Sequence, residues 1–124
     1  MTKDAVIQSF FESFGLPAYP AISVPTGDDA PDFPYITYSA PTDSDLSKVM
    51  VTASLWYRST LWTEVNAMAR LISQTIGQSY TLPCDEGGII VRKGSPWAQP
   101  MGDDSDNMIK RKILTFEFTF VTTY

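Results

Sequence analysis

The residues best suited to chemistry are acids gathered in one short stretch, Asp103-Asp104-Ser105-Asp106-Asn107. Clustered carboxylates are the ligands that Ca²⁺ prefers, so we compared this stretch with a calcium loop of the EF-hand type. Such a loop needs glycine at its sixth position and a carboxylate at its twelfth. Counted from Asp103, those positions hold Met108 and Leu114, and counting from the next acid also fails. The pattern therefore predicts a solvated surface loop and no metal site.

Other catalytic constellations are missing from the sequence. The chain has no histidine and one cysteine, Cys84. It therefore lacks Ser-His-Asp and Cys-His arrangements, and it cannot form a thiolate zinc site or an internal disulfide. No phosphate-binding glycine motif is present, and Gly87-Gly88 indicates a turn. Paired-carboxylate hydrolysis stays open only if Asp85, Glu86 and the 103–106 acids converge. We expect no enzyme, no cofactor and no metal.

Composition predicts one soluble domain spanning residues 1–124. The 124 residues are 44% hydrophobic and 13% aromatic, and the formal charge is −5. An acidic chain is a poor binder of a phosphate backbone, and the short basic run 110–112 is better explained as a solvated strand end than as a nucleic-acid patch. No apolar run is long enough to cross a bilayer, and no secretion signal is recognisable. We expect synthesis in a cytoplasm, with neither membrane nor sequence-specific nucleic-acid binding.

The C-terminal segment Ile109–Tyr124 is the clearest predicted strand and must face a helix or a second sheet. Its face with period two is apolar and mostly aromatic, and consists of Leu114, Phe116, Phe118 and Phe120. A first helix is predicted over Lys3–Phe14, capped by Thr2, and its apolar stripe suits that face. A long second helix is predicted from an N-cap at Ser59 or Thr60 to Gly77, with Leu61 at the start of its apolar stripe.

The remaining segments predict strands and turns. Strands are expected at Phe33–Ser39 and Lys48–Tyr57, the second of them central, and a short one is possible at Ala21–Val24. Acidic turns are expected at Thr26–Asp32 and Pro41–Ser47. Tyr80–Cys84 and Ile89–Lys93 form a predicted hairpin, and Gly94–Met108 is a predicted loop. The fold class is therefore α+β: a twisted, mainly antiparallel or mixed sheet with an N-terminal helix and one long central helix packed on it.

Two ordered segments carry a family resemblance. One is Leu55-Trp56-Tyr57-Arg58-Ser59-Thr60 with Trp62. The other is Arg92-Lys93-Gly94-Ser95-Pro96-Trp97-Ala98-Gln99-Pro100-Met101-Gly102-Asp103, followed by Met108-Ile109-Lys110-Arg111. The segments 10–19 and 33–38 fit the same pattern. Together they resemble the tail terminator (tail-completion, or minor tail) proteins of long-tailed bacteriophages and prophages of Gram-positive hosts.

The resemblance implies a virion structural protein without catalysis. Proteins of this family form a ring, commonly hexameric, on the head-proximal end of the tail tube. The ring stops tube polymerisation and offers a docking surface for head–tail joining. The implied partners are copies of the chain, the tail tube protein and the head–tail connector proteins. The implied location is the tail or neck of the virion, after assembly in the host cytoplasm. The alternatives are another neck component, such as a head-closure or head–tail joining protein, and a small-ligand-binding or enzymatic α+β domain.

Within that resemblance we expect particular contact residues. The side chains of Trp97 and Met101, with Gln99 between them, are either tucked onto their own domain or free for a partner. Opposite charges suit a head-to-tail ring, with Lys110 and Arg111 of one subunit near Asp28, Asp29 or Asp43 of the next. The acids facing the bore, if the loop lies there, are Asp103, Asp104 and Asp106; a solvated outer loop is the alternative. Trp56 or Trp62 is expected in the core, and Arg58 over an aromatic ring or beside an acid.

Overall fold

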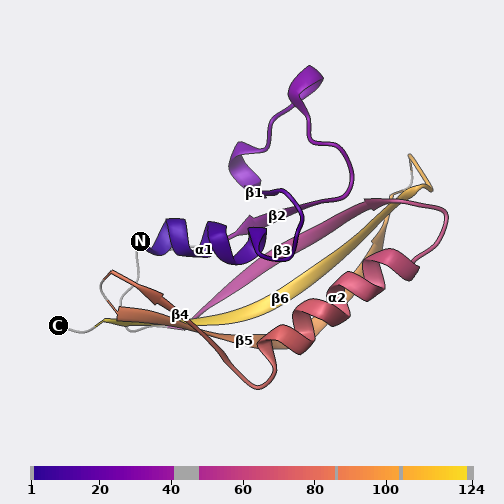
Figure 1. Cartoon of the computed structure of the whole chain (residues 1–124). Coiled ribbons are helices and arrows are strands. Elements are labelled where there is room, and N and C mark those ends of the chain that lie inside the picture. The colour runs from indigo at the N-terminus through magenta and orange to yellow at the C-terminus, as the bar shows by residue number, and fades with distance from the viewer. Residues whose placement is uncertain (1, 41–47, 86, 104, 123–124) are drawn as a thin grey trace.

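The protein is a mixed α+β domain built on one curled six-stranded sheet. The computed structural model describes residues 2–40, 48–85, 87–103 and 105–122. The sheet order is β1-β2-β3-β6-β5-β4. Strands β1 (Ala18–Pro20) and β2 (Tyr35–Ser39) pair in parallel, and every other neighbouring pair is antiparallel. Figure 1 shows the long strands crossing the molecule as a twisted band with the two helices against it.

The centre of the sheet is the pair formed by β3 (Lys48–Arg58) and β6 (Ile109–Thr122), in register from Lys48↔Thr119 to Arg58↔Ile109. The predicted alternation is confirmed, because Phe116, Phe118 and Phe120 have no exposed surface. Side chains of paired residues lie on the same side of a sheet, so this phenylalanine face also carries Val51 and Leu55 of β3. The prediction of a central strand after residue 47 is also confirmed.

Helix α1 (Lys3–Glu12) begins where the sequence predicts, and Thr2 Oγ1 accepts a hydrogen bond from the Ala5 amide at 3.2 Å. Its aromatic stripe meets the phenylalanine face: the Phe10 ring lies edge-on to Phe116 at 6.2 Å, and Phe11 lies edge-on to the same ring at 5.5 Å. Such edge-to-face pairs add to the free energy gained by burying the rings. The first helix is therefore held mainly by aromatic packing.

Helix α2 (Thr63–Ile76) begins later than predicted. The hydroxyl of Ser59 accepts a hydrogen bond from the Leu61 amide within the connecting turn, and Trp62 occupies the N-cap position without a side-chain bond. Leu61 consequently lies outside the helix and is 64% exposed. The predicted end is correct, because Gly77 follows Ile76 with a positive φ of 58°. The buried residues of α2 are Val65, Ala69, Ile72 and Ile76.

The largest correction concerns the segment predicted as a loop from Gly94 to Met108. Strand β4 (Tyr80–Cys84) and the start of β5 form the predicted hairpin, but β5 runs from Gly87 to Gly102. Its second half pairs with β6, from Ala98↔Leu114 to Gly102↔Lys110, after a bulge of residues 94–97 opposite Thr115. Strand β4 pairs with β5 only up to Val91, so the second half of β5 is an edge strand. A proline on the outer side of an edge strand removes no ladder hydrogen bond. Proline and glycine are therefore compatible with a strand here.

The segment between β1 and β2 is the second correction. Ala21–Ser23, considered as a short strand, is a 3₁₀ turn, and Ala18–Pro20 forms the strand instead. The turn predicted at Thr26–Asp32 is confirmed by a second 3₁₀ turn at Gly27–Asp29. Residues 21–34, named here the acidic arm, rise away from the sheet in Figure 1. The predicted turn Pro41–Ser47, with Asp43, lies outside the described residues.

Candidate assembly surfaces

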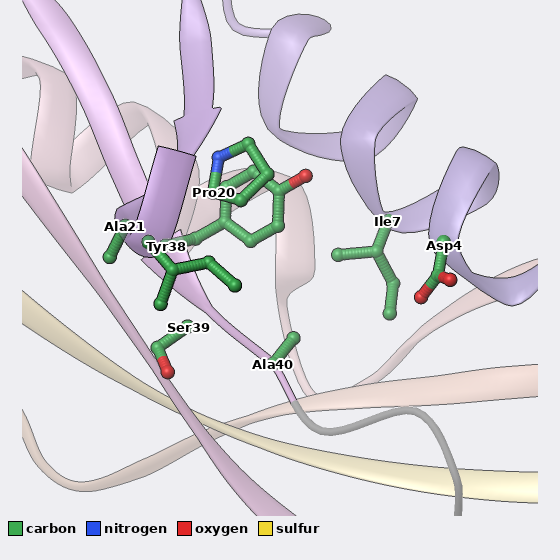
Figure 2. A pocket seen from close by; sticks show the side chains of 8 residues that line it. Asp4, Ile7, Pro20, Ala21, Tyr38, Ser39 and Ala40 are labelled. Atoms are coloured by element: carbon green, nitrogen blue, oxygen red, sulfur yellow. The ribbon is translucent and has the colours of Figure 1, made fainter. Parts of the chain in front are cut away.

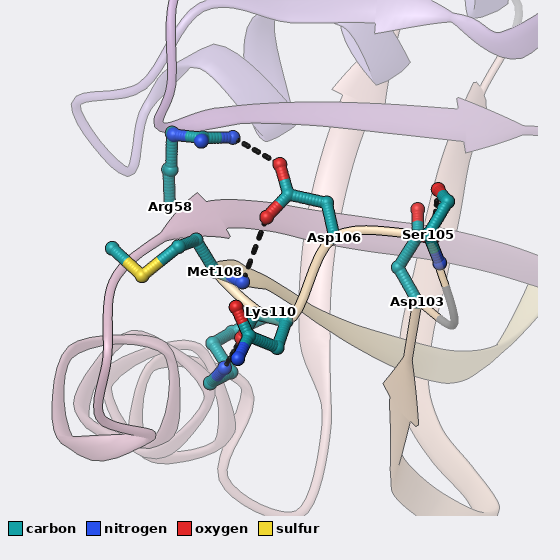
Figure 3. A network of polar contacts seen from close by, with 7 residues as sticks. Arg58, Asp103, Ser105, Asp106, Met108 and Lys110 are labelled. Atoms are coloured by element: carbon teal, nitrogen blue, oxygen red, sulfur yellow. Dashed lines mark hydrogen bonds and ion pairs between the residues drawn. The ribbon is translucent and has the colours of Figure 1, made fainter.

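The loop at the tip of the β5–β6 hairpin is tied to the sheet through Asp106. One carboxylate oxygen lies 2.5 Å from Arg58 Nη1 on β3, and the other accepts a hydrogen bond of 2.9 Å from the Met108 amide. Figure 3 shows both contacts at the end of the hairpin. The Met108 amide, and then Arg58, hold the pKa of Asp106 below its usual value. Arg58 was predicted to lie over an aromatic ring or beside an acid. The structure shows the second arrangement, with Asp106 as the acid.

Asp103 serves the same loop. Its Oδ1 accepts hydrogen bonds from the hydroxyl of Ser105 at 2.6 Å and from the Ser105 amide at 2.8 Å, and these bonds lower the pKa of Asp103. Asp104, the third acid predicted to face a bore, lies outside the described residues. Within the described ranges, no group of three or more His, Cys, Asp or Glu residues is placed to hold a metal ion. The two described acids therefore shape the hairpin tip, and a bore-facing position stays a prediction.

Lys110 and Arg111, predicted to join one interface, point to opposite faces of β6. Lys110 is only 9% exposed; its ammonium donates to the carbonyl oxygen of Asn107 and lies 5.7 Å from the centre of the Trp62 ring. Arg111 lies on the other face, with its guanidinium carbon 4.5 Å from the centre of the Trp56 ring and Nε 3.1 Å from Ser54 Oγ. Only Arg111 is therefore positioned for a partner on that second face.

The predicted contact residues of β5 also divide between the two faces. Trp97 lies edge-on to Phe116 at 5.1 Å and packs against the core, so its side chain is tucked onto its own domain. Gln99 pairs with Ile113, and Met101 pairs with Arg111. Met101 is 42% exposed, and it shares the face of Arg111. Met101 is consequently the better candidate for contact with a partner.

The face of the sheet opposite the phenylalanine face is named here the open face, and neither described helix packs on it. An aromatic column crosses it: Tyr19 lies edge-on to Tyr35 at 6.4 Å, and Tyr35 stacks on Trp56 at 6.0 Å. Trp56 Nε1 donates a 2.9 Å hydrogen bond to Thr37 Oγ1. Arg111 ends the column. Burial raises the pKa of Tyr35, while the positive charge of Arg111 acts in the opposite direction.

This aromatic column was not predicted as a surface. Trp56 or Trp62 was expected in the core: Trp62 packs against it, whereas Trp56 is half-buried on the open face. The available signal was strand alternation: Val51, Ala53 and Leu55 share the buried face of β3, so Trp56 must point the other way. The open face also carries Met50, which is 53% exposed, and Arg92 of β5.

The acidic arm contains both charged and apolar exposed side chains. Asp28, Asp29 and Asp32 are exposed, and no side-chain hydrogen bond or ion pair joins them to another described residue. Its 3₁₀ turn is closed locally, by the amides of Asp29 and Ala30 bonding to the carbonyl oxygens of Thr26 and Gly27. Ile22 is 99% exposed. The aspartates and Ile22 of the arm are therefore available to a partner, while Phe33 at its end lies 5.4 Å from the Tyr35 ring.

A pocket of about 660 Å³ lies between α1, the base of the arm and the end of β2. Figure 2 shows Ile7 and Asp4 of α1 facing Pro20 and Tyr38 across it. The hydroxyl of Tyr38 donates to Gln8 Oε1, and burial, followed by the charges of Asp4 and Glu12, raises the pKa of that hydroxyl. The lining of the pocket is mostly apolar, and the hydroxyl of Tyr38 is already hydrogen-bonded within the domain.

Comparison with known proteins gives no independent assignment for these surfaces. No protein-family model matches the chain, and no curated protein matches its sequence. No helix in the described ranges is long and apolar enough to cross a membrane.

Proposed function

We propose that this chain is a tail terminator of a long-tailed bacteriophage or prophage: a structural protein that caps the head-proximal end of the tail tube. The cap would stop tube polymerisation and offer the docking surface for head–tail joining. The observation that carries the proposal is the ordered set of segments that resembles this family, at 10–19, 33–38, 55–62 and 92–111. Another neck component is the nearest alternative, because it would also act through surfaces of this kind.

The arrangement of those segments supports an assembly role. Residues 55–58 lie in β3, residues 92–102 in β5 and residues 109–111 in β6, the strand between them. The Arg58–Asp106 pair joins the first segment to the tip loop between β5 and β6. In the proposed architecture α1 and the longer α2 pack on one face of the sheet. The open face and the acidic arm are left for contacts with neighbouring subunits and with the tube.

The proposed mechanism is physical and needs no reaction. A heterologous contact between different patches of identical subunits closes into a ring when its rotation closes. We propose a ring, commonly hexameric in proteins of this kind, that matches the symmetry of the tube end and covers the surface where the next tube subunit would add. The connector proteins would then bind the opposite side of the same ring. If the hairpin tip faces the bore of the ring, its acids line the passage for DNA; we predict this position from the resemblance.

The test is to delete the gene from the phage or prophage that carries it and to examine particles by electron microscopy. We expect tails of uncontrolled length, or tails without heads, and recovery of normal particles when the intact gene is supplied. Free tails of normal length that fail to join heads would favour the alternative neck component. Normal-length tails joined to heads in the deletion strain would refute both assignments.

A further inference from the structure

We propose that the acidic arm of one subunit docks on the open face of the next subunit, around Trp56, Met101 and Arg111. The contact rests on the proposed function, because it names the two surfaces that would close the ring. The partner is a second copy of this chain, and the two surfaces are different patches. The contact is therefore heterologous, as a ring requires.

Charge complementarity is the first argument for this partner. The arm presents Asp28, Asp29 and Asp32 and contains no lysine or arginine. The described ion pairs are Lys48–Glu117 and Arg58–Asp106. Arg111 is in neither pair, and its guanidinium is held by a ring and a neutral hydroxyl. An arginine stacked on an aromatic ring keeps donors free for a carboxylate, so an aspartate can be accepted there without breaking an existing ion pair.

Apolar complementarity is the second argument. Ile22 near the base of the arm is 99% exposed, while Met50 and Met101 on the open face are 53% and 42% exposed. Thioether side chains adapt to irregular apolar partners. The stacked Tyr35 and Trp56 lie in the same row of the sheet as Arg111 and Met101. They give a rigid surface with a small loss of side-chain entropy on binding, which suits the centre of an interface.

The position of the arm is the third argument. It leaves the sheet between β1 and β2 and projects beyond the rest of the domain in Figure 1. Its acids make no described side-chain bond with their own domain, so docking them on a neighbour breaks no such contact. The chain carries a formal charge of −5, and self-association of an acidic protein needs a local cationic patch to offset the general repulsion.

The test uses two reversals of charge and two matched controls, all in the full chain. Asp29→Lys reverses a charge on the arm, and Arg111→Glu reverses the charge on the open face. Glu64→Lys and Arg70→Glu make the same charge changes on exposed residues of α2. Sedimentation velocity over a concentration series measures association, and circular dichroism checks that each variant is folded. We expect each arm or face variant to associate at least about tenfold more weakly, with both controls unchanged.

Mixing the two defective variants gives the sharper result. An alternating ring of Asp29→Lys and Arg111→Glu subunits places lysine against glutamate at one contact and aspartate against arginine at the next. We therefore expect the equimolar mixture to recover association that neither variant has alone. The proposal would be overturned if both variants associated as strongly as wild type. It would also be overturned if the equimolar mixture associated no more strongly than either variant alone.

Disulfide trapping tests the same contact when association is too weak to sediment. In a Cys84→Ser background, one preparation carries Asp29→Cys and the other Met101→Cys. We expect the mixture to form a heterodimer under mild oxidation, well above a control in which Leu71→Cys, on an exposed residue of α2, replaces Met101→Cys. Trapping no greater than the control overturns the docking proposal. It leaves the tail-terminator proposal standing, because that proposal is tested separately by tail length in the deletion strain.

Discussion

Asp106 shows how one partly exposed acid can hold a hairpin tip. Its two oxygens are used by Arg58 of β3 and by the Met108 amide, so one side chain connects the loop to the neighbouring strand. The hydrogen bonds of Asp103 and Asp106 close the loop and tie it to β3.

Asp106→Asn should make the protein less stable at neutral pH, because asparagine cannot form the ion pair with Arg58. The folded-state pKa of Asp106 is lowered, so its stabilising contribution is present above the unfolded-state pKa, about 4, and is lost as pH falls through the lower folded value. Urea unfolding from pH 7 to pH 2.5 should show the difference between the variant and wild type shrinking with acid. A difference that grows with acid would contradict this assignment.

The matched control for that series is Asp28→Asn. Asp28 is exposed on the arm and makes no side-chain bond with another described residue. We expect this variant to unfold at the same urea concentration as wild type across the series, so that any pH-dependent difference in Asp106→Asn belongs to the hairpin tip.

At the scale of elements, the bulge in β5 decides how the long hairpin fits together. Residues 94–97 lie opposite Thr115 alone, and Gly94 makes the close approach possible. A Cβ added at Gly94 would lie 2.7 Å from Thr115 Cγ2 and 3.1 Å from the Thr115 carbonyl oxygen. The second of these atoms belongs to the backbone of β6, so it cannot move aside without disturbing the sheet.

Gly94→Ala should therefore destabilise the fold by about 1–3 kcal/mol, the usual cost of overpacking a tight site. Gly102→Ala in the same strand is the control, since a Cβ there meets nothing within 4 Å, and we expect it to change stability by less than about 0.5 kcal/mol. Chemical denaturation measures both. An unchanged midpoint for Gly94→Ala would mean that the bulge is not as tight as described.

The same strand shows what the sequence could and could not predict. Local patterns predicted α1, β3, β6 and the β4–β5 turn well, because each has a strong period or a clear stop signal. The second half of β5 was predicted as loop, because Pro96 and Pro100 have no amide hydrogen and therefore disfavour a strand when only the local sequence is considered. This half of β5 pairs with β6, which is distant in the sequence, and beyond Val91 no described strand pairs with its other edge. The local sequence shows neither of these conditions.

The candidate surfaces were predictable only in part, for related reasons. The acidic arm follows from composition. The separation of Lys110 from Arg111 was already implied by the predicted strand that contains them, because successive side chains point to opposite faces. The contact of Trp97 with Phe116 was not predictable, since Trp97 lies in the bulge of β5, and the bulge exists only through pairing with β6.

At the scale of the whole molecule, the domain is asymmetric in a way that suits assembly. One face of the sheet is buried by aromatic packing, and the other presents an aromatic column ending in Arg111. The acidic arm projects from the same domain, and Asp28, Asp29 and Asp32 make no side-chain bond with another described residue. Two complementary but separate patches allow each subunit to contact the next one. The angle between the patches determines whether the row of subunits closes into a ring.

The growth of tail tubes in the presence of the purified chain measures directly whether this protein caps a tube. Tube protein from the same phage is assembled with a gold-labelled preparation of this protein, and tube lengths and label positions are scored by electron microscopy. We predict label at a single end of each tube and arrest of elongation at that end. Tubes that elongate to the same lengths with and without the protein, and that carry no label at either end, would contradict the proposed capping role.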